Sequence, residues 1–244
     1  GLMLANESWE LQRDHFARTH RVITYDLRGQ GRSEHTRGGL GLDSLAEDAA
    51  ELLRALAPEG AHVAGFSMGA FIALRLGARH PALVRSLTLI GVSADAEGWA
   101  KMPSYAAMIA VVSLAGVGPV APRMMQILFG RSILADPARA ALIARWRAVV
   151  DDLPKSIVRA AAASASRGSV MEEIGRITAP VLIVAGEEDH PVPLHHQQAV
   201  AAAIAQAQIE VVPVTGHAVM IERPDWFNGR MAQFLETMRA RSSS

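Results

Sequence analysis

The stretch that decides the fold is GAHVAGFSMGAFIALRLGARHP, residues 60–81. It begins with a short apolar run, Ala61–Phe66, that is typical of a buried strand, and it continues into a helical pattern that Pro81 closes. Between the two stands a serine flanked by glycines, Gly65-Phe66-Ser67-Met68-Gly69. Serine fills a core poorly, and glycine costs about 0.5–1 kcal/mol inside a regular element. The pattern therefore indicates a demand on the backbone that is unrelated to stability.

A sharp strand–turn–helix explains this demand. The residue at the apex is held in strained backbone geometry, and its side chain projects from the edge of the sheet. Residues two before and two after the apex must be small, or the strand and the helix collide. The sequence thus predicts Ser67 as a nucleophile, against the alternative of a serine in an ordinary helix N-terminus.

The rest of the chain alternates short β-branched runs with longer helical patterns. We expect strands within residues 20–33, 61–66, 84–92, 179–189 and 208–217, and helices over residues 43–56, 68–80, 192–207 and 224–241. Ser44 and Glu47 have the spacing of a capping box at the start of the first helix. Strands separated by helices of this length imply right-handed crossovers. The prediction is an α/β fold with a mostly parallel central sheet flanked by helices.

Residues 94–177 do not follow this alternation of strands and helices, because they have almost no strand signal. They have helical patterns, one of which starts with Asp136 as N-cap and Pro137 at the first helical position. We expect a helical cap, or lid, inserted into an α/β core formed by residues 1–93 and 178–241. Residues 102–122 are uncharged and long enough to span a bilayer, but three prolines and two glycines interrupt them, so no membrane span is expected.

A serine hydroxyl needs a base to activate it and an acid to orient that base. In proteins with this turn the acid comes first along the chain and the histidine follows, each on a loop after a later strand. Asp189 follows one such strand and His217 follows the next. We therefore predict Asp189 as the acid and His217 as the base. Glu188 remains an alternative acid, because a shift of one residue in the loop would exchange the two.

Three further histidines lie close to Asp189 in sequence. His190, His195 and His196 are too near to come from the next strand, and we interpret them as part of a solvated loop and helix start. A metal site among them is the alternative, but the chain lacks H-E-x-x-H and a second cluster. No metal and no cofactor are expected.

Four motifs in this order resemble the α/β-hydrolase fold, in its small esterase, lactonase and perhydrolase branch. The resemblance covers nearly the whole chain and favours Asp189 over Glu188. The first two motifs are DLRGQGRS at 26–33, which is similar to the family's loop D-x-R-G-x-G-x-S, and GFSMG at 65–69, which is similar to the nucleophile elbow. The other two are GEEDHPVP at 186–193, which is similar to the acid loop, and GHAVMIERPDWFN at 216–228, which is similar to the stretch around the base.

The resemblance implies an oxyanion hole and a missing strand. Gly1 resembles the glycine of the family's H-G motif, so Leu2 and Met68 would donate the two backbone N–H groups. In the family a third strand lies between the strands that correspond to Val22–Asp26 and His62–Phe66. We therefore expect an N-terminal segment of the working protein to precede Gly1. Without it, backbone groups would be left unpaired in the centre of the sheet.

Composition limits the partners. The 24 basic and 24 acidic residues leave no electrostatic footprint for nucleic acid, and the absence of cysteine excludes disulfides and thiol chemistry. No signal-peptide pattern is visible, so we expect a cytoplasmic protein. The sequence does not indicate an oligomeric state, and a homodimer stays open.

The predicted cap is rich in apolar residues and has few fixed charges near its start, which favours uncharged, apolar acyl groups of short to medium length. Four aromatic residues are candidate pocket walls: Trp99, Tyr105, Phe129 and Trp146. The predicted function is a serine hydrolase of carboxylic esters or lactones. The alternatives are an N-acyl-homoserine lactonase, a perhydrolase or acyltransferase on the same triad, and a ligand-binding receptor.

Overall fold

The computed structural model describes residues 1–242 and has a four-stranded parallel sheet at its centre. The strands are β1 (Ala61–Phe66), β2 (Val84–Ile90), β3 (Val181–Gly186) and β4 (Ala207–Val212), and they lie side by side in chain order. The expected strands within 61–66, 84–92, 179–189 and 208–217 are thus confirmed, as is the parallel sheet flanked by helices.

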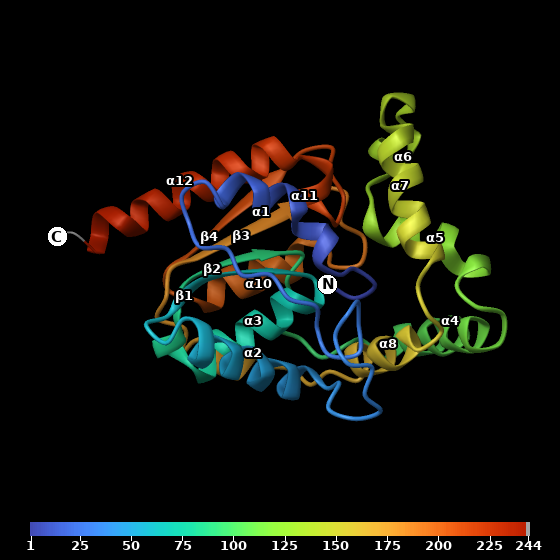
Figure 1. The fold of residues 1–244 in the computed structure, drawn as a ribbon, viewed down its shortest axis with the longest axis horizontal. Coiled ribbons are helices and arrows are strands. Elements are labelled where there is room, and N and C mark those ends of the chain that lie inside the picture. Colours follow the sequence, from blue (N-terminus) through green and yellow to red (C-terminus); the bar gives the residue numbers. More distant parts are fainter. Residues whose placement is uncertain (243–244) are drawn as a thin grey trace.

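Helices pack on both faces of this sheet (Figure 1). On one face, α2 (Leu42–Leu56) and α3 (Met68–Arg79) share a buried cluster with the strands, and α10 (Leu194–Ala203) adds Val200 to it. On the other face, α1 (Glu10–Phe16), α11 (Val219–Glu222) and α12 (Pro224–Ser242) bury their apolar side chains in a second cluster. Because helices cover both faces of the sheet, β3 is buried along its whole length. A strand buried on both faces has a continuous run of apolar residues rather than an alternating pattern.

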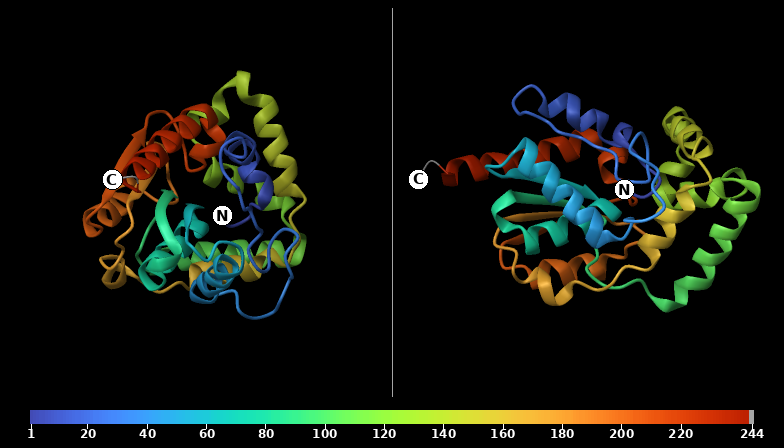
Figure 2. Two further views of the ribbon diagram at one scale, coloured as in Figure 1. Left: turned by 60° about the vertical axis from the view of Figure 1, so that its left-hand side comes forward. Right: turned by 60° about the horizontal axis from the view of Figure 1, so that its bottom comes forward.

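Only helical elements lie between β2 and β3. They are η3 (Trp99–Lys101), α4 (Met102–Ala115), η4 (Gly118–Val120), α5 (Ala121–Leu128), α6 (Arg131–Ala135), η5 (Pro137–Arg139), α7 (Ala140–Asp151), α8 (Ile157–Ala165) and α9 (Met171–Ile174). Helices α4 to α8 stand beside the sheet rather than on its faces (Figures 1 and 2). Among the described residues no helix is long and apolar enough to span a bilayer.

The helix-start signals gave mixed results. Asp136 accepts a hydrogen bond from the N–H of Ala138 at 2.9 Å, with Pro137 next to it, as predicted. The capping box of Ser44 and Glu47 is wrong: α2 begins two residues earlier at Leu42, with no side-chain cap. Ser44 therefore lies inside the first turn, where it has no N-terminal N–H group to cap.

The strand expected over Val22–Asp26 does not form. Residues 21–27 have no regular secondary structure and are not paired with any described strand, while η1 (Asn6–Trp9) and α1 precede them. A cavity of about 360 Å³ separates them from β1, with Val22 to Tyr25 on one side and Ala61, His62 and Ala64 on the other. An extended segment becomes a strand only when a neighbour supplies ladder hydrogen bonds, and here none of the described residues does so.

Candidate active site

The turn after β1 has the geometry that the sequence predicts. Ser67 sits between β1 and α3 with φ 51° and ψ −119°, a region that costs a non-glycine residue about 1–3 kcal/mol. A Cβ at Gly65 would lie 2.6 Å from the carbonyl oxygen of Gly69, so only glycine fits there. At Gly69 the steric argument fails, because an added Cβ would meet only the backbone nitrogen of Gly1, at 4.0 Å.

Asp189 and His217 meet at the carboxyl ends of β3 and β4. Oδ2 of Asp189 lies 2.8 Å from Nδ1 of His217, and both side chains are buried. The same carboxylate is held by the N–H of Val192 at 2.9 Å and by the side-chain amide of Gln197 at 3.3 Å. With three partners around it, the carboxylate is fixed in place and can orient the imidazole ring.

Glu188 points elsewhere. Its two oxygens accept hydrogen bonds from the backbone N–H and the hydroxyl of Ser132, at 2.9 Å and 2.5 Å. Glu188 therefore links the loop after β3 to α6, and the structure brings Asp189, not Glu188, to His217. Of the three other histidines, His196 lies 2.8 Å from Asp95. No group of three histidine or acidic side chains in the described part of the chain is placed to hold a metal ion.

Ser67 and His217 line the same cavity, which has a volume of about 100 Å³. The ring of His217 also packs against Phe66, with centroids 4.7 Å apart. Among the described residues no hydrogen bond joins the Ser67 hydroxyl to His217. Catalytic hydrogen bonds are often long or poorly aligned without substrate, so this geometry leaves Ser67 a candidate nucleophile.

The two predicted oxyanion-hole residues, Leu2 and Met68, both lie next to the cavity or the turn that contains Ser67. Leu2 lines the cavity, and Met68 opens α3 directly after Ser67. The turn at Leu2 is anchored by Gln30, whose side-chain oxygen accepts a hydrogen bond from the N–H of Met3 at 2.9 Å. Sequence reasoning did not single out Gln30, which lies within the quoted DLRGQGRS motif.

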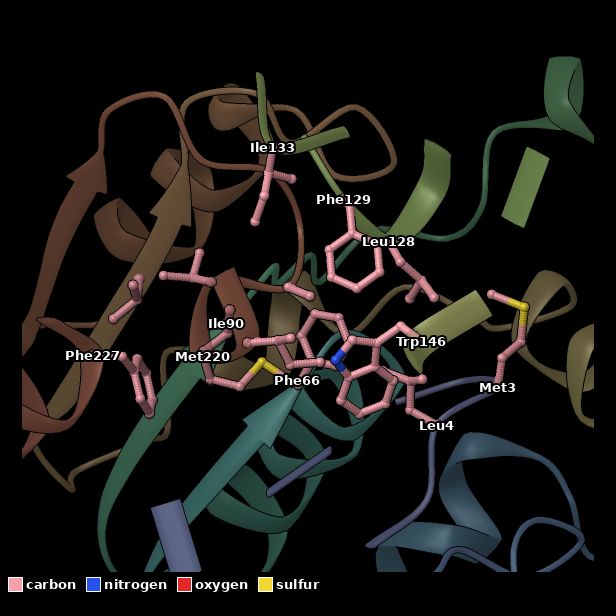
Figure 3. Packing of buried hydrophobic residues seen from close by; sticks show 14 of the residues in the cluster. Met3, Leu4, Phe66, Ile90, Leu128, Phe129, Ile133, Trp146, Met220 and Phe227 are labelled. Atoms are coloured by element: carbon pink, nitrogen blue, oxygen red, sulfur yellow. The ribbon is translucent and has the colours of Figure 1, made fainter. Parts of the chain in front are cut away.

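The four aromatic candidates lie in different places. Tyr105 lines the cavity, and Phe129 lines an adjoining groove and packs in the core beside Trp146 (Figure 3). Trp146 is buried but is not among the cavity-lining residues, and Trp99 is 86% exposed and also lies outside the lining. The structure therefore brings only Tyr105 and Phe129 to the two spaces around the site.

Apart from Ser67, Ser164 and His217, the cavity wall is apolar except at one corner, where a buried ion pair lies. Arg167 donates to Glu97 at 2.8 Å, and each side chain is only 7% exposed. Tyr105 donates to the same carboxylate at 3.0 Å. Burial, with the nearby negative charge of Glu97, raises the pKa of Tyr105 to about 12, so the phenol is neutral at ordinary pH. The expectation of few fixed charges thus misses this corner.

Two residues outside the predicted set, Glu222 and Gly91, contact the loops or the side chain of the site. Glu222 is buried, and its two oxygens accept hydrogen bonds from the N–H groups of Gly130 and Gly216, at 3.1 Å and 2.9 Å. Gly216 directly precedes His217. Gly91, at the end of β2, lies so close to His217 that an added Cβ would be 2.5 Å from the imidazole Cε1. The glutamate in GHAVMIERPDWFN was a signal for Glu222, whereas no motif marks Gly91.

Comparison with known proteins agrees with this fold. The chain belongs to the alpha/beta hydrolase fold family, whose model matches residues 4–224. It is 28% identical over 230 residues to RutD of Agrobacterium fabrum, a protein that carries the provisional name carbamate hydrolase, with 91% of this chain and 84% of RutD covered.

Two solved structures show the same architecture. A thermophilic esterase from Thermogutta terrifontis superimposes with a TM-score of 0.89 at 25% identity, covering 98% of this chain and 88% of the esterase. Est816, described as an N-acyl homoserine lactone degrading enzyme, superimposes with a TM-score of 0.79 at 28% identity, covering 95% and 89%. Family and relatives together support a hydrolase.

Proposed function

We propose that the protein is a serine hydrolase that cleaves carboxylic esters or lactones through an acyl-enzyme. One observation carries this proposal: the buried Asp189–His217 pair faces a mostly apolar cavity that is also lined by Ser67 at its strained turn. A strained apex residue, a paired imidazole and a water-poor cavity are what acyl transfer by a serine requires.

In the proposed mechanism Ser67 Oγ attacks the acyl carbonyl, and Nε2 of His217 takes the hydroxyl proton. The carboxylate of Asp189 keeps the proton of the imidazole on Nδ1 and stabilises the imidazolium that forms. His217 then protonates the leaving alcohol. Water attacks the acyl-enzyme with His217 again as base, and Ser67 is released. The N–H groups of Met68 and Leu2 bind the oxyanion, and the loss of one such donor typically costs about 10²–10³ in turnover.

The helical segment of residues 94–177 is proposed to act as a cap over this site. Helices α4, α5 and α8 supply cavity-lining residues such as Met108, Leu128 and Ile157, opposite Ser67. A cavity of about 100 Å³ with these apolar walls suits a short acyl group.

Hydrolysis of N-acyl homoserine lactones is a second candidate. A lactone is an internal ester, so the same steps apply. The likeness to Est816 favours this class, and the phenol oxygen of Tyr105 in the polar corner can accept a hydrogen bond from the amide N–H of such a substrate. Comparing butyrolactone-ring substrates with open esters of equal acyl length separates the two candidates.

The test is a panel of p-nitrophenyl esters from acetate to octanoate, with lactones and an aryl carbamate beside them. We expect turnover of short esters by the wild type and none by Ser67→Ala, and we expect Ser67→Ala to keep its far-ultraviolet circular dichroism. Ser166→Ala, an exposed serine on the cap, is the matched control and should keep full activity.

A phosphonate probe supplies an independent readout, because it labels only an activated serine. We expect one adduct per chain, on Ser67. Turnover that persists in Ser67→Ala would contradict the assignment, and binding without turnover across the whole panel would favour a receptor. Product analysis with peroxide or an alcohol present detects perhydrolase or acyl-transfer outcomes.

A further inference from the structure

A second, larger cavity adjoins the one that contains Ser67. It has a volume of about 810 Å³ and lies between α4, α5, α6 and the loop after β3. Tyr105, Met108, Ile127 and Pro191 line both spaces, so a substrate at Ser67 would extend into the larger one. We refer to this larger cavity as the outer groove.

The outer groove carries basic side chains and no acidic ones in its lining. Its four basic residues are Lys101, Arg123, Arg131 and His190. Over the whole chain Lys and Arg together equal Asp and Glu in number, 24 each, so a lining with Lys101, Arg123 and Arg131 but no acidic residue does not reflect the composition. A cleft lined by one sign of charge concentrates ligands of the opposite sign.

Neighbouring carboxylates leave much of this charge available. Lys101 is partly neutralised by Glu97, 3.3 Å away. Burial raises the pKa of Glu188, but hydrogen bonds from Ser132 and the nearby charges of Arg131 and His190 lower it, so Glu188 offsets part of the charge of Arg131 and His190. Arg123 donates to the neutral side chain of Gln126 at 3.2 Å. Neither Arg123 nor Arg131 forms an ion pair with any described residue.

The volumes of the two cavities also indicate that the substrate extends into the outer groove. Ligand pockets usually measure about 300–1,000 Å³, and the inner cavity alone is too small for that class. The outer groove brings the combined space into the usual range. The inner cavity would then hold the acyl group, and the groove would hold the alcohol part of the ester.

We propose that the preferred substrate is an ester whose alcohol part carries an anionic group, a carboxylate or a phosphate, which the outer groove binds through Arg123 and Arg131. The inference rests on the proposed serine hydrolase function. It changes the expected substrate from fully uncharged to apolar at the acyl end and anionic at the other.

The experiment compares three esters with the same acyl group: phenyl butyrate, its 3-carboxyphenyl analogue and its 3-phosphate-bearing analogue. The readout is the ratio of kcat/KM for each anionic ester to that for phenyl butyrate. Comparing this ratio between wild type and variants cancels any effect that a substitution has on the chemical step of both esters alike. Electrostatic steering raises association rates by about 10–10³-fold, so we expect a ratio of about 10 or more at low salt. The ratio should approach 1 at about 0.5 M salt because of screening. The larger of the two anionic ratios identifies carboxylate or phosphate as the preferred group.

Arg123→Gln and Arg131→Gln should each lower the ratio by about threefold to tenfold. Arg159→Gln removes an exposed arginine on α8 that lies outside the groove, and it should leave the ratio unchanged. A wild-type ratio near 1 at low salt, or a ratio that the groove variants do not lower, would overturn the inference while Ser67-dependent turnover of phenyl butyrate still supports the proposed function. Absence of Ser67-dependent turnover of all three esters would contradict both.

Discussion

Replacing Gly91 by alanine is the sharpest test of the assignment of His217, because it adds one methyl group beneath the imidazole. Gly91 follows β2 and has φ +59°, and an added Cβ would lie 2.5 Å from Cε1 and 2.7 Å from Nδ1 of His217. It would also lie 3.3 Å from Oδ2 of Asp189. The backbone of Gly91 thus packs directly against the Asp189–His217 pair.

The size of the effect follows from these distances. An ordinary carbon contact is about 3.5–4.0 Å, so the imidazole must retreat by about 1 Å. A misplacement of about 1 Å can cost about 10²-fold in rate. The left-handed backbone costs alanine about 1–2 kcal/mol, and the overpacking adds about 1–3 kcal/mol. We therefore expect Gly91→Ala to lower kcat/KM by about 10²-fold and the free energy of unfolding by about 2–5 kcal/mol.

The assay pairs p-nitrophenyl ester turnover with urea unfolding. Gly39→Ala is the matched control, because Gly39 has φ +72° but an added Cβ would meet nothing nearer than 3.6 Å. It should lose stability through backbone strain and keep its activity. If Gly91→Ala, still folded, kept kcat/KM within about threefold of the wild type, the contact with His217 would not be relevant to the reaction, and the proposed role of His217 would fall.

The remaining predictions concern carboxylates around the site. Asp189→Asn should lower turnover by about 10³–10⁴-fold, whereas Glu188→Gln should stay within about tenfold of the wild type; the reverse order would make Glu188 the acid. Glu222→Ala leaves two buried N–H groups unpaired and should lower the free energy of unfolding by about 2–5 kcal/mol, measured in urea. Burial raises the pKa of Glu222, so its contribution is present below the ordinary pKa and falls as the pH rises through the raised value. The difference in unfolding free energy between wild type and variant should therefore narrow as the pH rises above the ordinary pKa of glutamate, and a widening difference would contradict this reasoning.

Local patterns predicted much of the core. The strand at Ala61–Phe66 has the expected bounds and the helix after Ser67 ends one residue earlier than expected, at Arg79, because apolar periodicity and Pro81 act over a few residues. The elbow was predictable for the same reason, since Gly65 contacts atoms only a few residues away. The acid–base pair required one non-local rule, the order of loops along a parallel sheet.

Features that depend on distant partners were not predictable from local pattern. The segment at 21–27 has strand-forming residues, yet pairing needs a neighbour that β-propensity cannot reveal. Aromatic identity likewise says nothing about orientation. Trp99 is 86% exposed and Trp146 is 3% exposed, although both lie in the same apolar helical segment.

The topology explains why Gly91 must be a glycine even though no motif marks it. The strand order β1-β2-β3-β4 is parallel throughout, so the four loops at the carboxyl ends follow one edge in chain order. Ser67 follows β1, while Asp189 and His217 follow β3 and β4. The loop after β2 must therefore pass between Ser67 and the Asp189–His217 pair, and the proposed reaction needs a small residue there so that His217 can approach Ser67. A residue without a side chain at that point is thus a requirement of the strand order, which a sequence can reveal only after the order is known.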